Sequence, residues 1–216
     1  MKGTIPCVNV YLMVILMNRI ITIGREFGSG GRELGRRLAE ELQIEYWDKE
    51  IIEAISEKTS LSQEYVNQVL SGVPHNLYPI TIGQSFYPMH SFYYNDQPNR
   101  VLEAKNEIIR SLAEKSSCVI VGRCADYILR DIKPYRIFVY ADIESKVKRC
   151  MGRQGEKENL TSEQMKKKIL SVDKKRAAYY KNYTGNKWGD KANYDLCINT
   201  TDAVIKDIVP HIAKML

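Results

Sequence analysis

The sequence that most constrains the fold is IITIGREFGSGGRELGRRLAEEL, residues 20–42. It begins with a short β-branched run at 20–23, which is typical of a strand, and continues through three glycines and a serine. It ends with Leu34, Leu38 and Leu42, whose spacing of four places them on one face of a helix. The stretch therefore predicts a strand, a glycine-rich loop and a helix in immediate succession.

A loop of this kind is suited to binding an anion. Its backbone N–H groups can turn inward, and the N-terminus of the following helix adds a partial positive charge. The strict pattern GxxxxGK[ST] is absent, because Gly31 occupies the place expected for the lysine and Glu33 that of the Ser or Thr. Arg32 is the nearest cation. We expect a phosphate here; the alternative is a glycine-rich turn without a ligand.

Beyond this stretch, apolar strands alternate with helices. We predict strands at 44–47, 118–121, 135–140 and 194–198, and helices at 50–57, 62–70, 99–115, 144–153, 161–182 and 202–209, the last of which Pro210 ends or kinks. This order indicates an α/β fold with a parallel sheet covered by helices on both faces. Ligands of such folds bind beyond the carboxyl ends of the strands, where this chain has Gly24, Asp48, Arg123 and Asp142.

Residues 72–98 break the pattern with four prolines and six aromatic residues between 78 and 94. We expect an insertion with little regular structure. Its aromatic residues could line an acceptor pocket, form the interface of a homodimer or fix a long loop to the core.

The composition sets broad limits. A chain of 216 residues, 44% of them hydrophobic, can bury a core without disulfides. The net charge of +6 suits an anionic ligand but does not require nucleic acid. Five cysteines without a CxxC pair favour a reducing, cytoplasmic compartment, and the apolar run at 8–17 is too short to span a membrane. We interpret residues 1–17 as an extension upstream of the true start, with an extra strand or helix as the alternative, and residues 18–216 as one domain.

Five segments together resemble the cytidylate kinase-like family of P-loop proteins. They are IITIGREFGSGGRELGRRLAEEL, IEYWDKE, VIVGRCADYIL, RIFVYADIESKVKRCM and DKKRAAYYKNYTGNKWGDKANYDLCINT. The resemblance runs from about Asn18 to the C-terminus. It implies the P-loop NTPase fold of nucleoside monophosphate (NMP) kinases, with an NMP-binding insertion at about 49–98 and a helical lid at about 150–190. It also implies ATP and Mg²⁺ as cofactors and nucleotides as substrates.

The resemblance implies roles for particular residues. Asp48 would lie on the acceptor and metal side, and Arg123 matches an arginine that grips the acceptor. Cys124 stands where cytidylate kinases have an aspartate, with Asp126 two residues on, which puts recognition of cytosine in question. The donor phosphates would be held by Gly28, Ser29, Gly30, Gly31, Arg32 and Glu33, and the lid would contribute Arg149, Arg153, Asp173 and Arg176. Independently of the family, phosphoryl transfer requires cations around the developing charge.

Three functions compete. The leading hypothesis is a kinase that uses ATP and Mg²⁺ on an NMP such as CMP or dCMP, with Asp48 as metal organiser or base. The second is a nucleotide-binding protein with weak or no catalysis, or a kinase of another small acceptor, since the loop lysine is missing. The third is a single-stranded nucleic-acid binder, suggested by cations interleaved with aromatic residues at 174–188. It ranks last, because such a binder needs no glycine-rich loop.

Overall fold

A computed structural model of the chain describes residues 18–71, 96–153 and 160–216. The predicted extension at 1–17 and the aromatic residues at 78–94 lie outside these ranges. Within them, five strands form one parallel sheet in the order β2-β3-β1-β4-β5. In that order they are β2 (Glu45–Trp47), β3 (Cys118–Val121), β1 (Ile20–Arg25), β4 (Tyr135–Tyr140) and β5 (Leu196–Asn199).

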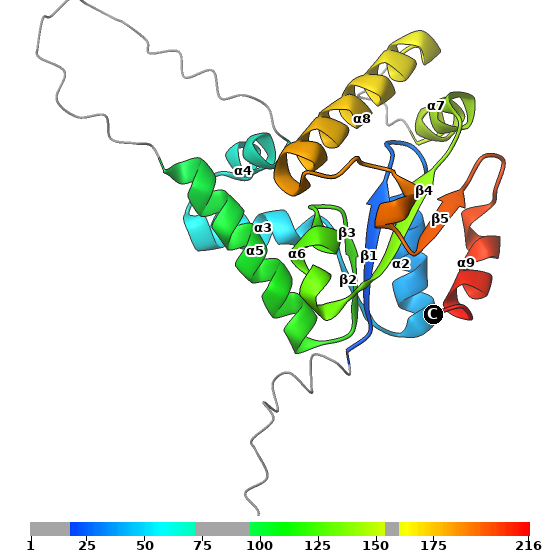
Figure 1. Cartoon of the computed structure of the whole chain (residues 1–216). Helices are drawn as coiled ribbons and strands as arrows, with labels where there is room; N and C mark the ends of the chain where they lie inside the picture. The colour runs from blue at the N-terminus through cyan, green and yellow to red at the C-terminus, as the bar shows by residue number, and fades with distance from the viewer. Residues whose placement is uncertain (1–17, 72–95, 154–159) are drawn as a thin grey trace, which may run out of the picture.

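Helices cover both faces of the sheet, as the sequence predicts (Figure 1). One face carries α2 (Gly31–Leu42) and α9 (Ile205–Ala213), and the other carries α3 (Glu50–Thr59), α5 (Gln97–Lys115) and α6 (Ala125–Ile128). The remaining elements are α4 (Gln63–Leu70), α7 (Ile143–Met151), α8 (Ser162–Thr184) and the 3₁₀ turns η1 (Arg130–Ile132) and η2 (Lys191–Asn193). Figure 1 shows α7 and α8 at the carboxyl end of the strands.

The alternation of side chains along β1 explains the two packed layers. Ile20 belongs to the cluster formed with α3 and α5, whereas Ile21 and Ile23 belong to the cluster with α2 and α9. All three are almost completely buried, which is why the strand reads as a continuous apolar run. Leu34 and Leu38 of α2 are also fully buried, as their spacing predicts.

The helix boundaries predicted next to two prolines are wrong. The helix predicted at 99–115 begins at Gln97, so Pro98 lies in its first turn, where a missing N–H costs no intrahelical bond. The last helix begins at Ile205 and continues through Pro210 to Ala213. Proline removes one amide donor there, but Val209 and Ile212 remain buried in the sheet-facing cluster, and this packing sustains the helix.

The sheet order places a topological switch point at β1. Its two neighbours, β3 and β4, both follow it in sequence, and the chain crosses to opposite sides of it. Ligands of open parallel sheets bind at such a point, outside the carboxyl ends of the strands. Among the helices that the structure describes, none is long and apolar enough to cross a membrane.

Candidate active site

The glycine-rich loop joins β1 to α2 at the switch point. Gly28 and Gly30 have φ of 79° and 83°, a region that L side chains rarely adopt. The first intrahelical bond of α2 runs from the Leu34 amide to the Gly30 carbonyl, at 2.9 Å. The preceding amides, those of Gly31, Arg32 and Glu33, are therefore the unpaired donors of a helix N-terminus, which is suited to bind a phosphate.

Two elements distant in sequence fix the loop from behind. The Asp173 carboxylate of α8 accepts a 2.7 Å hydrogen bond from the Phe27 amide. Lys146 of α7 is buried, and its Nζ lies 2.9 Å from the Glu26 carboxylate and 3.2 Å from that of Asp173. Asp173, expected as a lid residue, is thus engaged with the loop.

The two expected lid arginines of α7 and the following turn also contact the loop. Arg149 donates to the carbonyls of Gly28 at 2.8 Å and of Thr200 at 2.9 Å. Arg153 pairs with Glu33, which also accepts from Arg37 at 3.0 Å. Partial burial would raise the pKa of Glu33, but the bonds from Arg37 and Arg153 outweigh it and lower the pKa. These arginines stabilise the loop in the conformation seen here.

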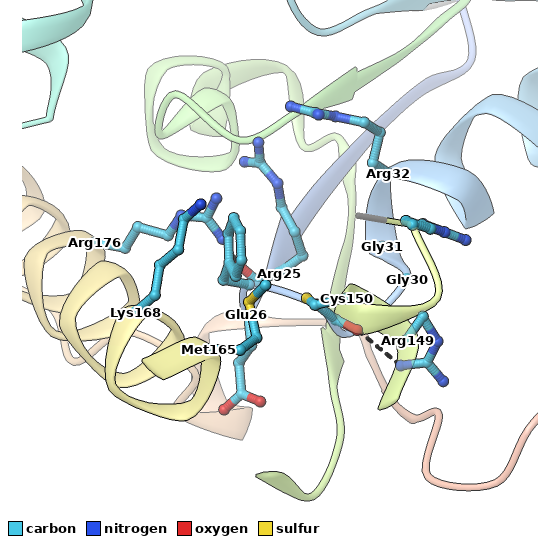
Figure 2. Close-up of a pocket in the computed structure, with 13 residues that line it drawn as sticks. Arg25, Glu26, Gly30, Gly31, Arg32, Arg149, Cys150, Met165, Lys168 and Arg176 are labelled. Carbon is cyan, nitrogen blue, oxygen red and sulfur yellow. Dashed lines mark hydrogen bonds between the residues drawn. The ribbon is translucent and has the colours of Figure 1, made fainter. Parts of the chain in front are cut away.

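A cavity of about 400 Å³ lies over the loop. Figure 2 shows Arg176, Lys168 and Met165 on its α8 side and Arg149 and Cys150 on its α7 side. We name it the donor cavity, because it contains the glycine-rich loop. Its lining residues are Arg25, Glu26, Phe27, Gly28, Gly30, Gly31, Arg32, Arg149, Cys150, Arg153, Met165, Lys168 and Arg176.

A second cavity of about 380 Å³ lies over the ends of β1 and β3, and we name it the acceptor cavity. It combines cations with aromatic rings, as expected for a ligand that is both anionic and aromatic. Its residues are Gly24, Arg25, Arg32, Asn67, Leu70, Ser71, Gly122, Arg123, Cys124, Asp126, Val172, Lys175, Arg176, Tyr179, Tyr180, Trp188 and Tyr194.

The turn after β3 holds the predicted acceptor arginine in an unusual backbone conformation. Gly122, Arg123 and Cys124 have φ of 77°, 57° and 55°, three successive residues in the left-handed region. A non-glycine residue costs about 1 kcal/mol or more there, and such strain clusters at functional sites. The Arg123 guanidinium lines the acceptor cavity and donates a long, 3.4 Å bond to the side-chain oxygen of Asn67.

Asp126, the other predicted acceptor residue, accepts a 2.6 Å hydrogen bond from the Tyr180 hydroxyl. Burial raises the pKa of this carboxyl, and the bond from Tyr180 opposes the rise. Both residues line the acceptor cavity. Asp126 is therefore held in a fixed orientation by α8.

Asp48 is buried between two arginines. One carboxylate oxygen lies 3.5 Å from Arg25 Nη2, and the other pairs with Arg32. With both oxygens facing guanidinium groups, Asp48 does not fit as a direct Mg²⁺ ligand in this arrangement. Within the described ranges, no group of three or more His, Cys, Asp or Glu residues could hold a metal. The oxygens that Mg²⁺ requires would then come from nucleotide phosphates and water.

Three arginines line both cavities: Arg25, Arg32 and Arg176. Sequence reasoning identified two of them and missed Arg25. Arg25 could have been found from its position, because it directly follows Gly24, which the sequence analysis placed at the end of a strand. Arg176 donates a 3.1 Å bond to the Arg25 carbonyl, so α8 is attached to the loop at this wall.

Two further groups were missed because tertiary packing alone brings them to the site. Lys105 of α5 is completely buried behind the acceptor cavity, with its Nζ 3.2 Å from the Tyr179 hydroxyl and 3.5 Å from the centre of the Tyr183 ring. Trp188 packs edge-on against Phe138, with ring centres 5.3 Å apart, and presents its indole to the same cavity.

Comparison with known proteins agrees with this geometry. The model of the family described as "Cytidylate kinase-like family" matches residues 20–202. The comparison with curated proteins gives no match. An uncharacterized protein from Eubacterium ventriosum is similar in structure at 29% identity and a TM-score of 0.63, covering 92% of this chain and 98% of that one.

Two shikimate kinases share the fold. The one from Bacteroides thetaiotaomicron is 15% identical with a TM-score of 0.53, covering 90% of this chain and 96% of its own. The one from Acinetobacter baumannii, in complex with shikimate, is 14% identical with a TM-score of 0.51, covering 94% and 96%. At these identities the likeness concerns the fold, which is that of P-loop kinases. Family and fold together support a P-loop phosphotransferase.

Proposed function

Since this chain belongs to the cytidylate kinase-like family, we propose that it transfers the terminal phosphate of ATP to a nucleoside monophosphate, with CMP or dCMP as the first candidates. The observation that carries the proposal is the pair of cavities with a shared wall of three arginines, Arg25, Arg32 and Arg176. A phosphoryl group passing from one cavity to the other would pass these three guanidinium groups.

The acceptor cavity supports a nucleotide. Tyr179, Tyr180, Trp188 and Tyr194 provide aromatic faces for a base, while Arg123 and the shared arginines provide donors for its phosphate. The predicted aromatic insertion at 78–94 lies outside the described residues. The support for a nucleotide therefore comes from the residues that line the acceptor cavity.

The proposed chemistry is an in-line displacement. An oxygen of the acceptor phosphate forms a bond to the γ-phosphorus of ATP, and the bond from that phosphorus to the β–γ bridging oxygen breaks. The bonding pair leaves with ADP, and a dianionic acceptor has no proton to lose. The chain's own residues position both phosphates and neutralise charge: loop amides at the donor, Arg123 at the acceptor and the shared arginines between them. Mg²⁺ would accompany ATP and supply further charge neutralisation.

Two alternatives lead to different results. A nucleotide-binding protein without catalysis is favoured by the missing loop lysine, and a kinase of another small acceptor remains compatible with the fold. The nucleic-acid hypothesis stays the last of the three, because a single-strand binder needs no glycine-rich loop.

The test is ADP release by the purified chain with ATP and Mg²⁺, with CMP, dCMP, UMP, AMP, GMP or shikimate added in turn. We expect one pyrimidine monophosphate to raise ADP release at least about 100-fold above the rate without acceptor. Phosphorylation of shikimate and of no nucleotide would mean that the acceptor belongs to another chemical class. ATP binding without acceptor-dependent turnover would favour the non-catalytic alternative.

A further inference from the structure

The missing lysine of the loop has a structural counterpart. At position 31 a side chain would begin 2.5 Å from the Cβ and 3.1 Å from the Cγ of Arg25, and 3.3 Å from the Cβ of Val139. The first of these distances is shorter than real Cβ contacts allow. Neither lysine nor any other side chain fits at position 31 while Arg25 holds its place.

The far end of the same side chain is enclosed in the same way. A Cβ at Gly122, which ends β3, would lie 1.7 Å from Arg25 Nη1 and 2.8 Å from its Cζ. Arg25 therefore passes between two glycines, Gly31 on α2 and Gly122 after β3. The other terminal nitrogen of Arg25, Nη2, lies 3.5 Å from the Asp48 carboxylate. The Arg25 side chain is 15% exposed.

We propose that Arg25 takes the place of the phosphate-loop lysine, contacting the phosphoryl group in transfer from the wall that the two cavities share, and that glycine at position 31 makes room for it. This inference rests on the proposed function. The phosphate-contacting cation would then lie at the end of β1 instead of at the helix N-terminus. There Arg25 lines both the donor and the acceptor cavity.

The chemistry of arginine suits this position. A guanidinium has five donors in a plane and can bond oxygens on two groups at once, whereas an ammonium acts as a point charge. Burial, and after it the neighbouring Arg176, lowers the pKa of Arg25 to about 10, so the group still carries its charge at neutral pH. Because the Arg25 side chain is 15% exposed, its charge is screened less by water than that of an exposed arginine.

The other two shared arginines are less constrained. The Arg32 side chain is 56% exposed and lies on the first turn of α2. Arg176 reaches the wall from α8 and is 30% exposed. Arg25 is the most enclosed of the three: its side chain fills the space that two glycines leave open, and Asp48 holds its guanidinium, which is the pre-organisation that transfer requires.

The test compares Arg25→Met and Arg25→Lys with the wild type and with Arg36→Met, an exposed arginine of α2 that pairs with Glu40. Binding of ATP and of ADP is measured by calorimetry, and turnover with the accepted acceptor. We expect Arg25→Met to lose about 10-fold or more in affinity for ATP with a change below about 3-fold for ADP, and to lose about 100-fold or more in kcat. The ATP affinity and kcat of Arg25→Lys should lie between those of Arg25→Met and the wild type. Those of Arg36→Met should match the wild type.

Gly122→Ala provides a second test that leaves every charge and the glycine-rich loop in place. Its methyl group would lie 1.7 Å from Arg25 Nη1 and would displace the guanidinium, so it should reproduce the selective loss of ATP affinity even if Arg25→Met does not fold. Equal losses for ATP and ADP, or an unchanged kcat in folded Arg25→Met, would overturn the inference while the kinase function stands.

The remaining outcomes separate the two proposals. Wild-type chain that binds ATP but phosphorylates no acceptor contradicts the proposed function, and the ratio of ATP to ADP affinity in the variants still decides the role of Arg25. Wild-type chain that does not bind ATP overturns both.

Discussion

Two buried lysines lie on opposite sides of the candidate site, and their surroundings differ. Lys146, behind the donor cavity, lies between two carboxylates, those of Glu26 and Asp173, at 2.9 and 3.2 Å. Lys105, behind the acceptor cavity, meets a tyrosine hydroxyl and the face of Tyr183, and within the described residues no carboxylate lies at ion-pair distance from it.

The difference indicates how charge is divided between the two cavities. On the donor side Lys146, Arg149 and Arg153 bond the chain's own carboxylates and carbonyls, so they shape the loop. On the acceptor side Lys105 and Arg123 have weak or uncharged partners. Arg123 lines the cavity, so its positive charge remains available where an anionic acceptor would bind.

The largest expected effect is that of Lys146→Met on stability. The substitution leaves Glu26 partly buried without its cation and leaves Asp173 with Arg176, at 3.9 Å, and breaking a buried pair in this way costs about 3–5 kcal/mol. We expect the free energy of unfolding in urea to fall by that amount. Lys148→Met, an exposed lysine of the same helix, is the matched control. A loss below about 1 kcal/mol would mean that Lys146 does not neutralise the loop carboxylates.

Lys105→Met tests the other lysine through pH. Burial lowers the pKa of Lys105 from 10.5 to about 8, so between these values the unfolded chain binds more protons than the folded one. Wild-type stability should then rise with pH across this window, relative to the variant, by up to about 3 kcal/mol. The measurement is urea unfolding of both proteins at pH 7.5, 9 and 10.5. A difference independent of pH would show that the tyrosine faces keep the lysine charged.

Arg123→Met should affect catalysis with little effect on stability. Its one long bond to Asn67 contributes little to folding, but loss of a charged donor to the acceptor phosphate should lower kcat/KM for that acceptor about 100-fold. Steady-state kinetics and thermal unfolding check this, with Arg110→Met, an exposed partner of Asp131, as the control. An equal fall in kcat/KM in both variants would show that Arg123 does not bind the acceptor phosphate.

Local sequence was sufficient to predict the fold. The apolar run at 20–23, the leucines of α2 and the strand-end positions follow from periodicity, and each strand was predicted to within two residues. Asp142, which the sequence placed at a strand end, caps α7, where its side chain accepts from the Ser145 amide. Helix ends failed at Pro98 and Pro210, where position in the turn and tertiary packing outweighed the general rule for proline.

The site was predictable only in part. Strand ends identified Asp48 and Arg123, because carboxyl ends of parallel strands meet at one edge. Arg25 escaped notice, since its role depends on space left by Gly31 and Gly122, which lie far apart in sequence. Lys105 was also missed, because a lysine in the middle of a helix sequence ordinarily marks the solvent-exposed face of that helix.

The smallest expected effect concerns the start of α8, the helix that carries Asp173 to the donor side and Arg176 to the shared wall. Thr161 forms a capping box with Gln164, its hydroxyl accepting from the Gln164 amide at 3.2 Å and the Gln164 side chain accepting from the Thr161 amide at 2.8 Å. We expect Thr161→Ala to lower the free energy of unfolding by about 1 kcal/mol, because one amide loses its acceptor. Thr161→Ser should retain nearly all of it. Since Asp173 and Arg176 lie about three and four turns further along, the KM values for ATP and acceptor should stay within about 2-fold of wild type. A larger change in the KM for ATP alone would mean that the donor side depends on how α8 begins.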